Sequence, residues 1–385
     1  MKVKKICVIA QAYPTETDPI FMFLDNVVQK FADSDIECIV ITPISWIEKK
    51  HKGKTRTYIT KGGHTIKIIC PRFMIYPSSN IGNFQTVKLS IDSFCRSAYR
   101  AFKKYVKSCD IIYSHFINMA GIAASYISRR KNIPCVTASG ESDLQKGLNV
   151  YHLYQREIYN INGFITVSTQ LKNDLISLGI VKKDVKIKVL PNAVDLSLFQ
   201  RTSQQESRAQ IGIPQDIFVI VFVGHFIERK GIQKVIDAIN RCENVYGIFI
   251  GDNELPSKCD QALIVKKIPH EKLPLYMNAG DVFVLPTLNE GCCNAIIEAQ
   301  ACGLPIISSD RDFNQDILDP NSALLIDPLS EDDLVSTITL IQKDKVLKES
   351  LVNASLERAK RHDINVRVAH IIDFMKEIID GDVVV

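Results

Sequence analysis

Short apolar runs alternate with longer amphipathic segments along most of this chain, and this alternation limits the fold more strongly than any other feature. Segments 21–31 and 88–107 have the spacing of apolar residues that is typical of helices. The apolar runs of the first half are residues 6–10, 38–42, 66–70, 111–113, 135–138, 164–167 and 187–190. Buried strands separated by helices predict a parallel sheet with helices on both faces.

A second set of the same kind follows a polar, irregular stretch over residues 191–215. Its apolar runs are 218–223, 246–250, 263–265, 282–285 and 306–308, with helical segments near 231–240 and 294–301. A chain of 385 residues also exceeds the length at which one core usually divides into two. We therefore predict an α/β protein with two Rossmann-like domains, whose parallel sheets face each other across a cleft. We expect an N-terminal domain over residues 1–195 and a C-terminal domain over residues 196–365. A last helix over residues 366–385 could pack back on the N-terminal domain.

The composition is that of a packed, soluble protein. Hydrophobic residues make up 46% of the chain and charged residues 23%, which excludes a disordered chain. The apolar run within Met1–Ala10 is too short for a signal sequence, and no run reaches the roughly 18 residues of a membrane span. The 11 cysteines are scattered without a Cys-x-x-Cys pair, which favours reduced thiols over disulfides or zinc. We expect a cytoplasmic protein.

Positive charge is concentrated in the first half of the chain. Residues 1–195 contain 28 Lys and Arg against 15 Asp and Glu, whereas the remainder contains 19 against 28. The basic residues form two groups, Lys49, Lys50, Lys52, Lys54 and Arg56, and Arg96, Arg100, Lys103, Lys104 and Lys107 along a predicted helix. One interpretation is a peripheral contact with an anionic membrane at the inner face of the plasma membrane. The other is an ordinary solvated helix face; no nucleic-acid partner is expected.

The segment over residues 282–305 predicts a strand, a loop, a helix and a turn. Glu290 ends the loop and Glu298 lies inside the helix. Between them, the backbone amides of Gly291, Cys292, Cys293 and Asn294 lie at the helix N-terminus, where unpaired N–H groups and the helix dipole favour a phosphate. Glu298 would then bind ribose hydroxyls, and Glu290 would reach the group that a diphosphate carries. The alternative is one carboxylate that stabilises the helix start and one that faces solvent.

A second motif, residues 223–231, follows the first strand of the second domain. Gly224 allows a close backbone approach to a ligand, and Lys230 can neutralise diphosphate oxygens as the bond to a sugar breaks. Taken alone, a glycine turn before a helix is also typical of any tight strand-to-helix connection.

Together these residues resemble the donor-site signature of glycosyltransferase family 4, the retaining enzymes of GT-B fold. Seven residues separate the two glutamates of that signature, as they separate Glu290 and Glu298, and the resemblance extends through 299–305 and 324–328. It implies transfer of a hexose or N-acetylhexosamine from a nucleoside-diphosphate sugar, most often UDP, with Glu290 and Lys230 as catalytic residues. The implied acceptor is a glycan or lipid-linked saccharide of surface polysaccharide biosynthesis. The resemblance implies neither a metal nor a cofactor.

Several positions depart from the family pattern. His225 stands where an arginine is common, so either His225 or Arg229 supplies the second cation to the diphosphate. By the same resemblance, backbone groups near Lys267 and Ile268 would contact the base. The glycine-rich loop usual after the first strand is replaced by residues 13–20, which contain no glycine.

The acceptor-side candidates follow two strands of the first domain. His115 follows the run 111–113, and Ser139, Glu141 and Asp143 follow the run 135–138, so all lie at carboxyl ends of predicted strands. Structural or solvated roles for these side chains are the alternative. Two other functions remain open, a nucleotide-sugar epimerase and a non-catalytic nucleotide-sugar-binding protein.

Overall fold

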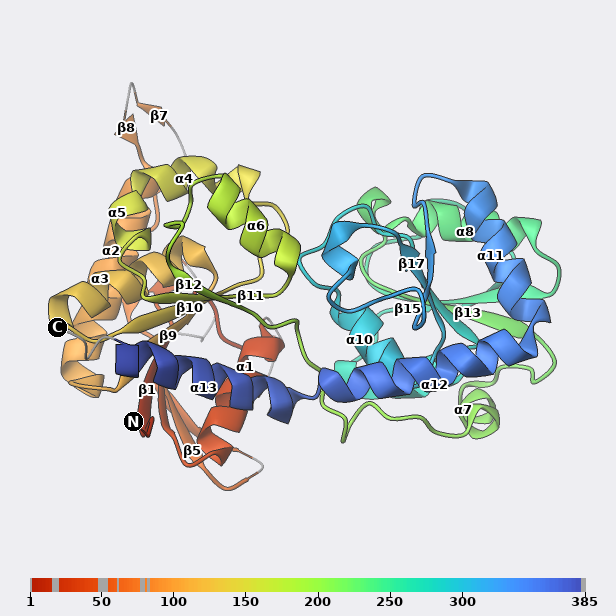
Figure 1. The fold of residues 1–385 in the computed structure, drawn as a ribbon, viewed down its shortest axis with the longest axis horizontal. Helices are drawn as coiled ribbons and strands as arrows, with labels where there is room; N and C mark the ends of the chain where they lie inside the picture. Colours follow the sequence, from red (N-terminus) through yellow and green to blue (C-terminus); the bar gives the residue numbers. More distant parts are fainter. Residues whose placement is uncertain are drawn as a thin grey trace. The chain divides into compact units, whose positions relative to one another are not determined.

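The computed structural model describes residues 2–15, 21–47, 55–60, 62–76, 80–81 and 84–381. These residues form two compact units, one from the described residues up to 190 together with 367–381, and the other from residues 191–366. The basic residues Lys49, Lys50, Lys52 and Lys54 and residues 16–20 of the loop without glycine lie outside the described part. The units are shown in Figure 1 and are described separately below.

The first unit contains an eight-stranded sheet in the order β12-β11-β10-β9-β1-β2-β5-β4. All neighbours are parallel except the edge strand β4, which is antiparallel to β5. The strands are β1 Lys5–Ile9, β2 Glu37–Ile41, β4 Arg56–Ile59, β5 Thr65–Ile69, β9 Ile111–His115, β10 Cys135–Ser139, β11 Gly163–Thr166 and β12 Lys186–Val189. Two short pairs lie outside this sheet, β3 Ile44–Ser45 with β6 Arg72–Phe73 and β7 Asn80–Ile81 with β8 Phe84–Gln85.

Helices cover both faces of this sheet, with α1 and α13 on one face and α2, α3, α5 and α6 on the other (Figure 1). They are α1 Met22–Asp33, α2 Val87–Ala101, α3 Ile122–Lys131, α4 Leu148–Leu153, α5 Gln155–Ile158, α6 Thr169–Ser177 and α13 Ile364–Gly381. The helix expected over 88–107 continues from α2 into a π-helical turn, Phe102–Val106; a second π-helical turn, Ile117–Gly121, precedes α3, and a 3-10 turn, Gln145–Gly147, precedes α4.

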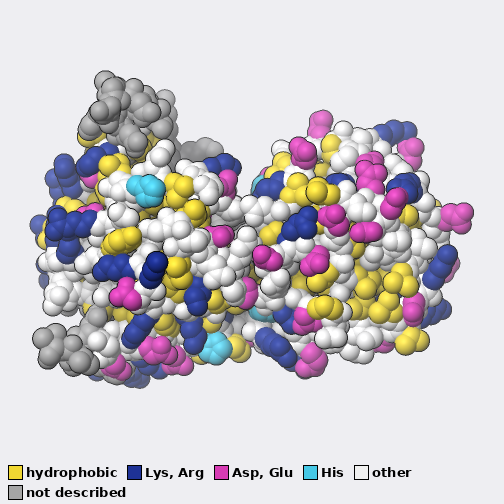
Figure 2. Space-filling model, turned by 45° about the horizontal axis from the view of Figure 1, so that its top comes forward, with side chains coloured by type: hydrophobic (Ala, Val, Ile, Leu, Met, Phe, Trp, Pro, Cys, Tyr) yellow, Lys and Arg dark blue, Asp and Glu magenta, His cyan; other side chains and the backbone are white. Residues whose placement is uncertain are grey.

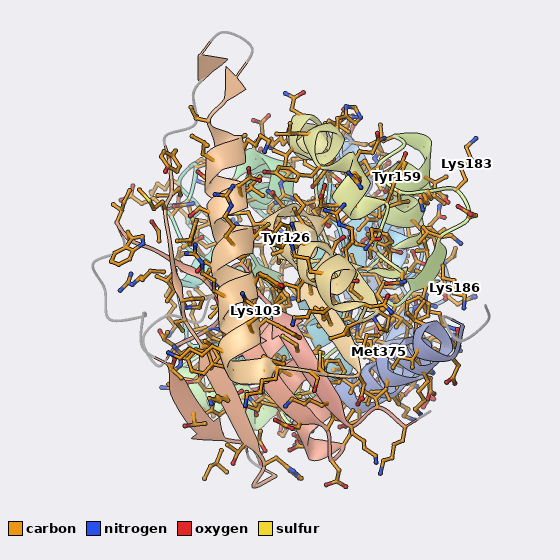
Figure 3. All side chains as sticks on the ribbon, turned by 90° about the vertical axis from the view of Figure 1, so that its left-hand side faces the viewer. Lys103, Tyr126, Tyr159, Lys183, Lys186 and Met375 are labelled. Carbon is orange, nitrogen blue, oxygen red and sulfur yellow. The ribbon has the colours of Figure 1, made fainter. Side chains whose placement is uncertain are left out.

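The last helix packs against β11 of the first unit. A Cβ at Gly163 would stand 2.7 Å from Ile378 Cδ1 and 2.9 Å from Phe374 Cζ, so only a residue without a side chain admits α13 this closely. The Lys186 ammonium of β12 also donates to the Glu377 carbonyl, at 3.2 Å. Lys186 and Met375 are labelled in Figure 3.

The second unit contains a six-stranded, fully parallel sheet in the order β15-β14-β13-β16-β17-β18. Its strands are β13 Phe218–Val223, β14 Val245–Ile250, β15 Ala262–Lys266, β16 Val282–Leu285, β17 Ile306–Ser309 and β18 Leu324–Ile326. Its helices are α7 Gln204–Ile211, α8 Ile232–Arg241, α9 Leu273–Asn278, α10 Asn294–Ala301, α11 Glu331–Lys343 and α12 Lys345–Arg361, with 3-10 turns at Glu228–Lys230, His270–Lys272 and Asp312–Asn314. Helices α8 and α11 cover one face, and α10 and α12 cover the other (Figure 1). The predicted α/β class with parallel sheets is confirmed.

In each sheet the strand order reverses beside the first strand of the unit. The reversal lies between β1 and β9 in the first unit and between β13 and β16 in the second. Ligands of open α/β sheets bind outside the carboxyl ends of the strands at such a point. The loops after these four strands are therefore expected to carry functional residues.

Two further expectations from the sequence concern the cysteines and membrane-spanning helices. All 11 cysteines lie within the described residues, and none of them is joined to another. No helix in the described part of the chain combines the length and the apolar character needed to cross a bilayer.

Candidate functional site

The second unit brings its two sequence motifs together where the strand order reverses. The Leu288 amide and the Thr287 hydroxyl, after β16, donate to the carbonyl of Arg229, after β13, at 2.8 and 3.1 Å. Gly231 ends the loop after β13 with a φ of 74°, and a Cβ there would stand 2.4 Å from the Pro286 carbonyl oxygen. Because only glycine tolerates both the dihedral and the approach, Gly231 is required to join the two loops.

Glu290 lies between two cations. Its Oε1 is 2.5 Å from Lys230 Nζ and 3.0 Å from Arg229 Nη1, and it accepts a hydrogen bond from the Thr287 hydroxyl at 3.0 Å. The side chains of Glu290 and Lys230 are each 11% exposed, whereas that of Arg229 is 38% exposed. Since two positive groups share one carboxylate, a net positive charge remains that favours an anion at this place.

The start of α10 lies immediately after Glu290. Cys293 is the N-cap residue, and its side chain makes no capping hydrogen bond. The Cys292 carbonyl accepts a hydrogen bond from the Asn192 side chain at 3.4 Å, which holds the loop. Gly291 and Cys293 are buried, and burial raises the pKa of the Cys293 thiol to about 11, so this cysteine remains neutral. Open amides at a helix N-terminus form a site for a phosphate or another anion.

Glu298 lies one turn further along α10 and is paired with a histidine. Its Oε1 is 2.8 Å from His270 Nε2, and its side chain is only 12% exposed. The hydrogen bond to Glu298 raises the pKa of His270, whose ring also contacts Phe199 with the centroids 5.1 Å apart. Glu298 is thus not a solvent-facing helix residue. The partner was missed from the sequence, although His270 lies just after the segment expected to contact a base.

His225 and Arg229 occupy different surroundings. His225 Nδ1 pairs with Asp252, the residue that follows β14 by two positions, whereas Arg229 joins Lys230 at Glu290. Lys267 Nζ also lies 3.9 Å from Asp252 and is 77% exposed, and the neighbouring Ile268 is half-buried. The structure therefore gathers Arg229 and Lys230 at the start of α10, and it ties His225 and Lys267 to one carboxylate that sequence reasoning missed. The only sequence feature that pointed to Asp252 was its position just after a predicted strand.

In the first unit, three of the four acceptor-side candidates lie close together. Ser139 Oγ donates to Glu141 at 2.5 Å, and the other oxygen of Glu141 accepts from the Ile117 amide, just after β9, at 2.7 Å. Burial raises the pKa of Glu141. His115 ends β9, is 4% exposed, and has its pKa lowered to about 3 by burial, so its imidazole is neutral. A Cβ at Gly140 would be 3.9 Å from His115 Nε2, which places the loop after β10 beside this ring.

Asp143 is engaged elsewhere. Its carboxylate is 3.1 Å from Lys146 Nζ and accepts from the Gln145 amide at 3.1 Å, and the hydrogen bond from Lys146 lowers its pKa. These bonds close a turn within its own loop. Within the described residues, no three His, Cys, Asp or Glu side chains form a group that could hold a metal ion.

Comparison with solved structures defines the class of fold. Sucrose-phosphate synthase from Thermosynechococcus elongatus matches with a TM-score of 0.78 at 17% identity, over 98% of this chain and 100% of that one. Anabaena Alr3699/HepE in complex with UDP matches with a TM-score of 0.72 at 15% identity, over 97% and 100%. The chain has the GT-B glycosyltransferase fold.

Sequence comparisons then give the family. The family model described as Glycosyltransferase Family 4 matches residues 23–198, and the model described as Glycosyl transferases group 1 matches residues 203–358. The putative teichuronic acid biosynthesis glycosyltransferase TuaC of Bacillus subtilis (strain 168) is 28% identical over 257 residues, covering 63% of this chain and 64% of its own. The UDP-Gal:alpha-D-GlcNAc-diphosphoundecaprenol alpha-1,3-galactosyltransferase of Escherichia coli is 27% identical over 284 residues, covering 65% and 70%. This chain belongs to glycosyltransferase family 4, as its motifs predicted.

Proposed function

We propose that this chain transfers a hexose or N-acetylhexosamine from a UDP-sugar to a glycan or lipid-linked saccharide in surface polysaccharide biosynthesis, with retention of configuration and without a metal. The observation that carries the proposal is Glu290, which lies between Lys230 and Arg229, with its side chain 11% exposed, shortly before the N-terminus of α10. Relatives named for teichuronic acid synthesis, capsular polysaccharide synthesis and transfer to a diphosphoundecaprenol-linked sugar support the acceptor class. Solved neighbours with UDP and with UDP-glucose support the donor class.

Each residue of the site has a part in this reaction. The amides of Gly291–Asn294 hold the diphosphate, and Lys230 and Arg229 stabilise the negative charge that grows on it as the sugar–oxygen bond breaks. Glu290 orients the sugar, and Glu298 binds the ribose hydroxyls. The acceptor oxygen bonds to the anomeric carbon on the face that the diphosphate leaves, and the acceptor proton passes to the leaving phosphate oxygen. No protein base is needed for this transfer.

The donor assignment is tested on the purified full chain. A thermal-shift series with UDP-, GDP-, ADP- and TDP-sugars gives the nucleotide, because a ligand of the native state raises the melting temperature. UDP release from UDP-glucose, UDP-galactose and UDP-N-acetylglucosamine is then measured with octyl glycosides as acceptor probes. We expect Glu290→Gln and Lys230→Ala each to lower turnover about 100-fold or more, and the exposed Glu254→Gln to leave it unchanged.

Several results would contradict this proposal. Near-normal turnover by both site variants would refute the donor site. Epimerisation of the nucleotide sugar without an acceptor would indicate an epimerase. Tight UDP binding with neither transfer nor slow hydrolysis would indicate a binding protein.

We also propose that the basic side of the first unit contacts an anionic membrane at the inner face of the plasma membrane. Arg100 of α2 and Lys103, Lys104 and Lys107, which follow it, are exposed, and Lys and Arg side chains gather on this unit in Figure 2. Aromatic rings hold three cations in place: Lys103 lies 4.9 Å from the Tyr99 centroid, Lys104 lies 5.1 Å from that of Tyr105, and Arg130 lies 3.4 Å from that of Tyr126. Figure 3 shows Lys103 and Tyr126 on neighbouring helices of one side. A cation–π contact leaves the side chain charged and shields its alkyl stem from water.

Apolar side chains lie on the adjoining segment of the first unit. Trp46 is 67% exposed and Met74 53% exposed, and the Trp46 amide donates to Phe73, so the two lie on paired segments. The Ser97 hydroxyl of α2 donates to the Arg72 carbonyl at 2.8 Å, which joins this segment to the basic helix. Tryptophan beside cations suits the interface of an anionic bilayer.

Co-sedimentation with phosphatidylglycerol vesicles tests the contact. We expect Lys103→Ala/Lys104→Ala and Trp46→Ala to weaken binding, and salt to weaken it further. Equal binding to phosphatidylcholine vesicles, or binding that does not change with salt, would contradict an electrostatic contact.

A further inference from the structure

Two phenylalanine rings contact His115 where the strand order of the first unit reverses, and a third phenylalanine packs against both of them. The ring centroid of Phe23 lies 4.8 Å from that of His115, and the ring of Phe116 lies 4.7 Å from it. The third ring, Phe21, lies 5.3 Å from Phe116 and 5.5 Å from Phe23. All three phenylalanines are half-buried. None of them has a part in the donor site.

The backbone around these rings is held in an unusual conformation. Phe116, the residue after β9, has φ 69° and ψ 141°, and Phe21, at the start of α1, has φ 59° and ψ 34°. A bulky residue at positive φ is a conformational outlier, and such strain is typical of residues that the surrounding structure holds for function.

His115 supplies a polar group within the aromatic cluster. It is 4% exposed, and its Nδ1 has no hydrogen-bond partner among the described residues. A buried polar atom without a partner costs free energy, which a ligand that bonds to it recovers. Because the imidazole is neutral, one ring nitrogen donates and the other accepts, and either role suits a hydroxyl group.

We infer that Phe21, Phe23, Phe116 and His115 form a saccharide subsite, in which the C–H face of an acceptor pyranose lies on the phenylalanines and one hydroxyl bonds to His115. A pyranose presents apolar C–H groups on its face and hydroxyls at its edge, which matches an aromatic surface with one buried polar atom. An alkyl chain would leave His115 Nδ1 without a partner. The inference rests on the proposed function, since it assigns the acceptor of that reaction to a sugar ring.

The test measures glycoside binding separately from donor binding. The method is saturation-transfer difference NMR on the full chain with methyl glucoside, methyl galactoside and methyl N-acetylglucosaminide. It shows which glycoside protons contact the protein, and a titration gives the affinity of each glycoside. We expect saturation to be strongest on the C–H protons of one ring face, and Phe23→Leu and Phe116→Leu to weaken binding about 3- to 10-fold each, the range for loss of one aromatic contact. Tyr159→Leu, at the end of α5, changes a half-buried aromatic residue outside the cluster; it is the matched control and should leave binding unchanged.

Donor binding distinguishes the two ways in which this test can fail. If UDP binds every variant as it binds the wild type but neither phenylalanine variant changes glycoside binding, the subsite is refuted and the proposed function stands. Preferential binding of octane-1-ol or uridine by the Phe23 site would refute it as well. If the wild-type chain binds neither UDP nor a UDP-sugar, the proposed function itself fails.

Discussion

The pair formed by Lys230 and Glu290 gives a prediction whose size follows from the structure. Lys230→Met removes the ammonium group and keeps most of the apolar stem, so it leaves the Glu290 carboxylate at 11% exposure without its shortest contact. Breaking a buried ion pair by removing one partner typically costs about 3–5 kcal/mol, because the remaining charge has no compensation. Here Arg229 and Thr287 still contact the same oxygen. We therefore expect a smaller loss in the free energy of unfolding, about 2–3 kcal/mol.

A double-mutant cycle isolates this interaction. Glu290→Gln removes the charge that Lys230→Met leaves behind, so the double variant should lose less stability than the two single variants together, with a coupling of about 1–2 kcal/mol. The measurement is urea unfolding followed by circular dichroism. The control is Lys258→Met, which removes a cation 2.7 Å from Asp260 on the surface, where the side chains are 86% and 76% exposed, and should change nothing measurable.

The outcome that would refute this reasoning is additivity. If the double variant loses as much stability as the two single variants together, Lys230 and Glu290 do not interact in the folded protein. Lys230 would then have to act on a ligand without first being held by Glu290.

Two further predictions concern residues of the same unit. The hydrogen bond to Glu298 raises the pKa of His270, so the pair stabilises the fold fully below the ordinary histidine pKa, and this stabilisation is lost as the pH rises through the pKa of His270 in the folded protein. The difference in melting temperature between the wild type and His270→Gln should therefore shrink from pH 5 to pH 9. A constant difference would argue against the pair. Gly231→Ala adds a Cβ 2.4 Å from the Pro286 carbonyl oxygen and should cost more stability than the control Gly212→Ala, where φ is also 74° but no atom lies within 4 Å. In thermal unfolding we expect a loss of about 1 kcal/mol for Gly212→Ala and at least twice that for Gly231→Ala. Equal losses would show that the loops after β13 and β16 can separate.

The parallel sheets were predictable because strands buried on both faces give continuous apolar runs, as in 218–223 and 282–285. The edge strand β4 was not predicted, since its residues alternate between exposed and half-buried and include Arg56. The order of strands across each sheet was also beyond the sequence, because it depends on contacts between segments far apart in the chain. The position of β1 or β13 within its sheet determines which loops lie next to each other. No local pattern of residues encodes that position.

The same distinction applies to the candidate site. Glu290 and Lys230 were selected because each stands in a motif that joins a strand to a helix, and the structure brings them within 2.5 Å. Their partners were harder to predict. The pairing of Asp252 with His225 depends on loops from neighbouring strands, and a polar residue after a strand is common enough to carry little information by itself.

The phenylalanines around His115 show most clearly why part of a site escapes sequence reasoning. Phenylalanine is usually a core residue, and Phe21 and Phe23 begin a helix in which Leu24, Val27, Val28 and Phe31 are buried. Only the three-dimensional arrangement reveals that these two rings stop short of the core and meet Phe116 beside an unpaired nitrogen. The proposed donor site thus consists of charged and glycine residues that stand out in the sequence, whereas the inferred acceptor site consists of residue types that ordinarily indicate packing. Differences among related transferases in the sugar they accept would, on this reasoning, arise at positions that sequence patterns assign to the core.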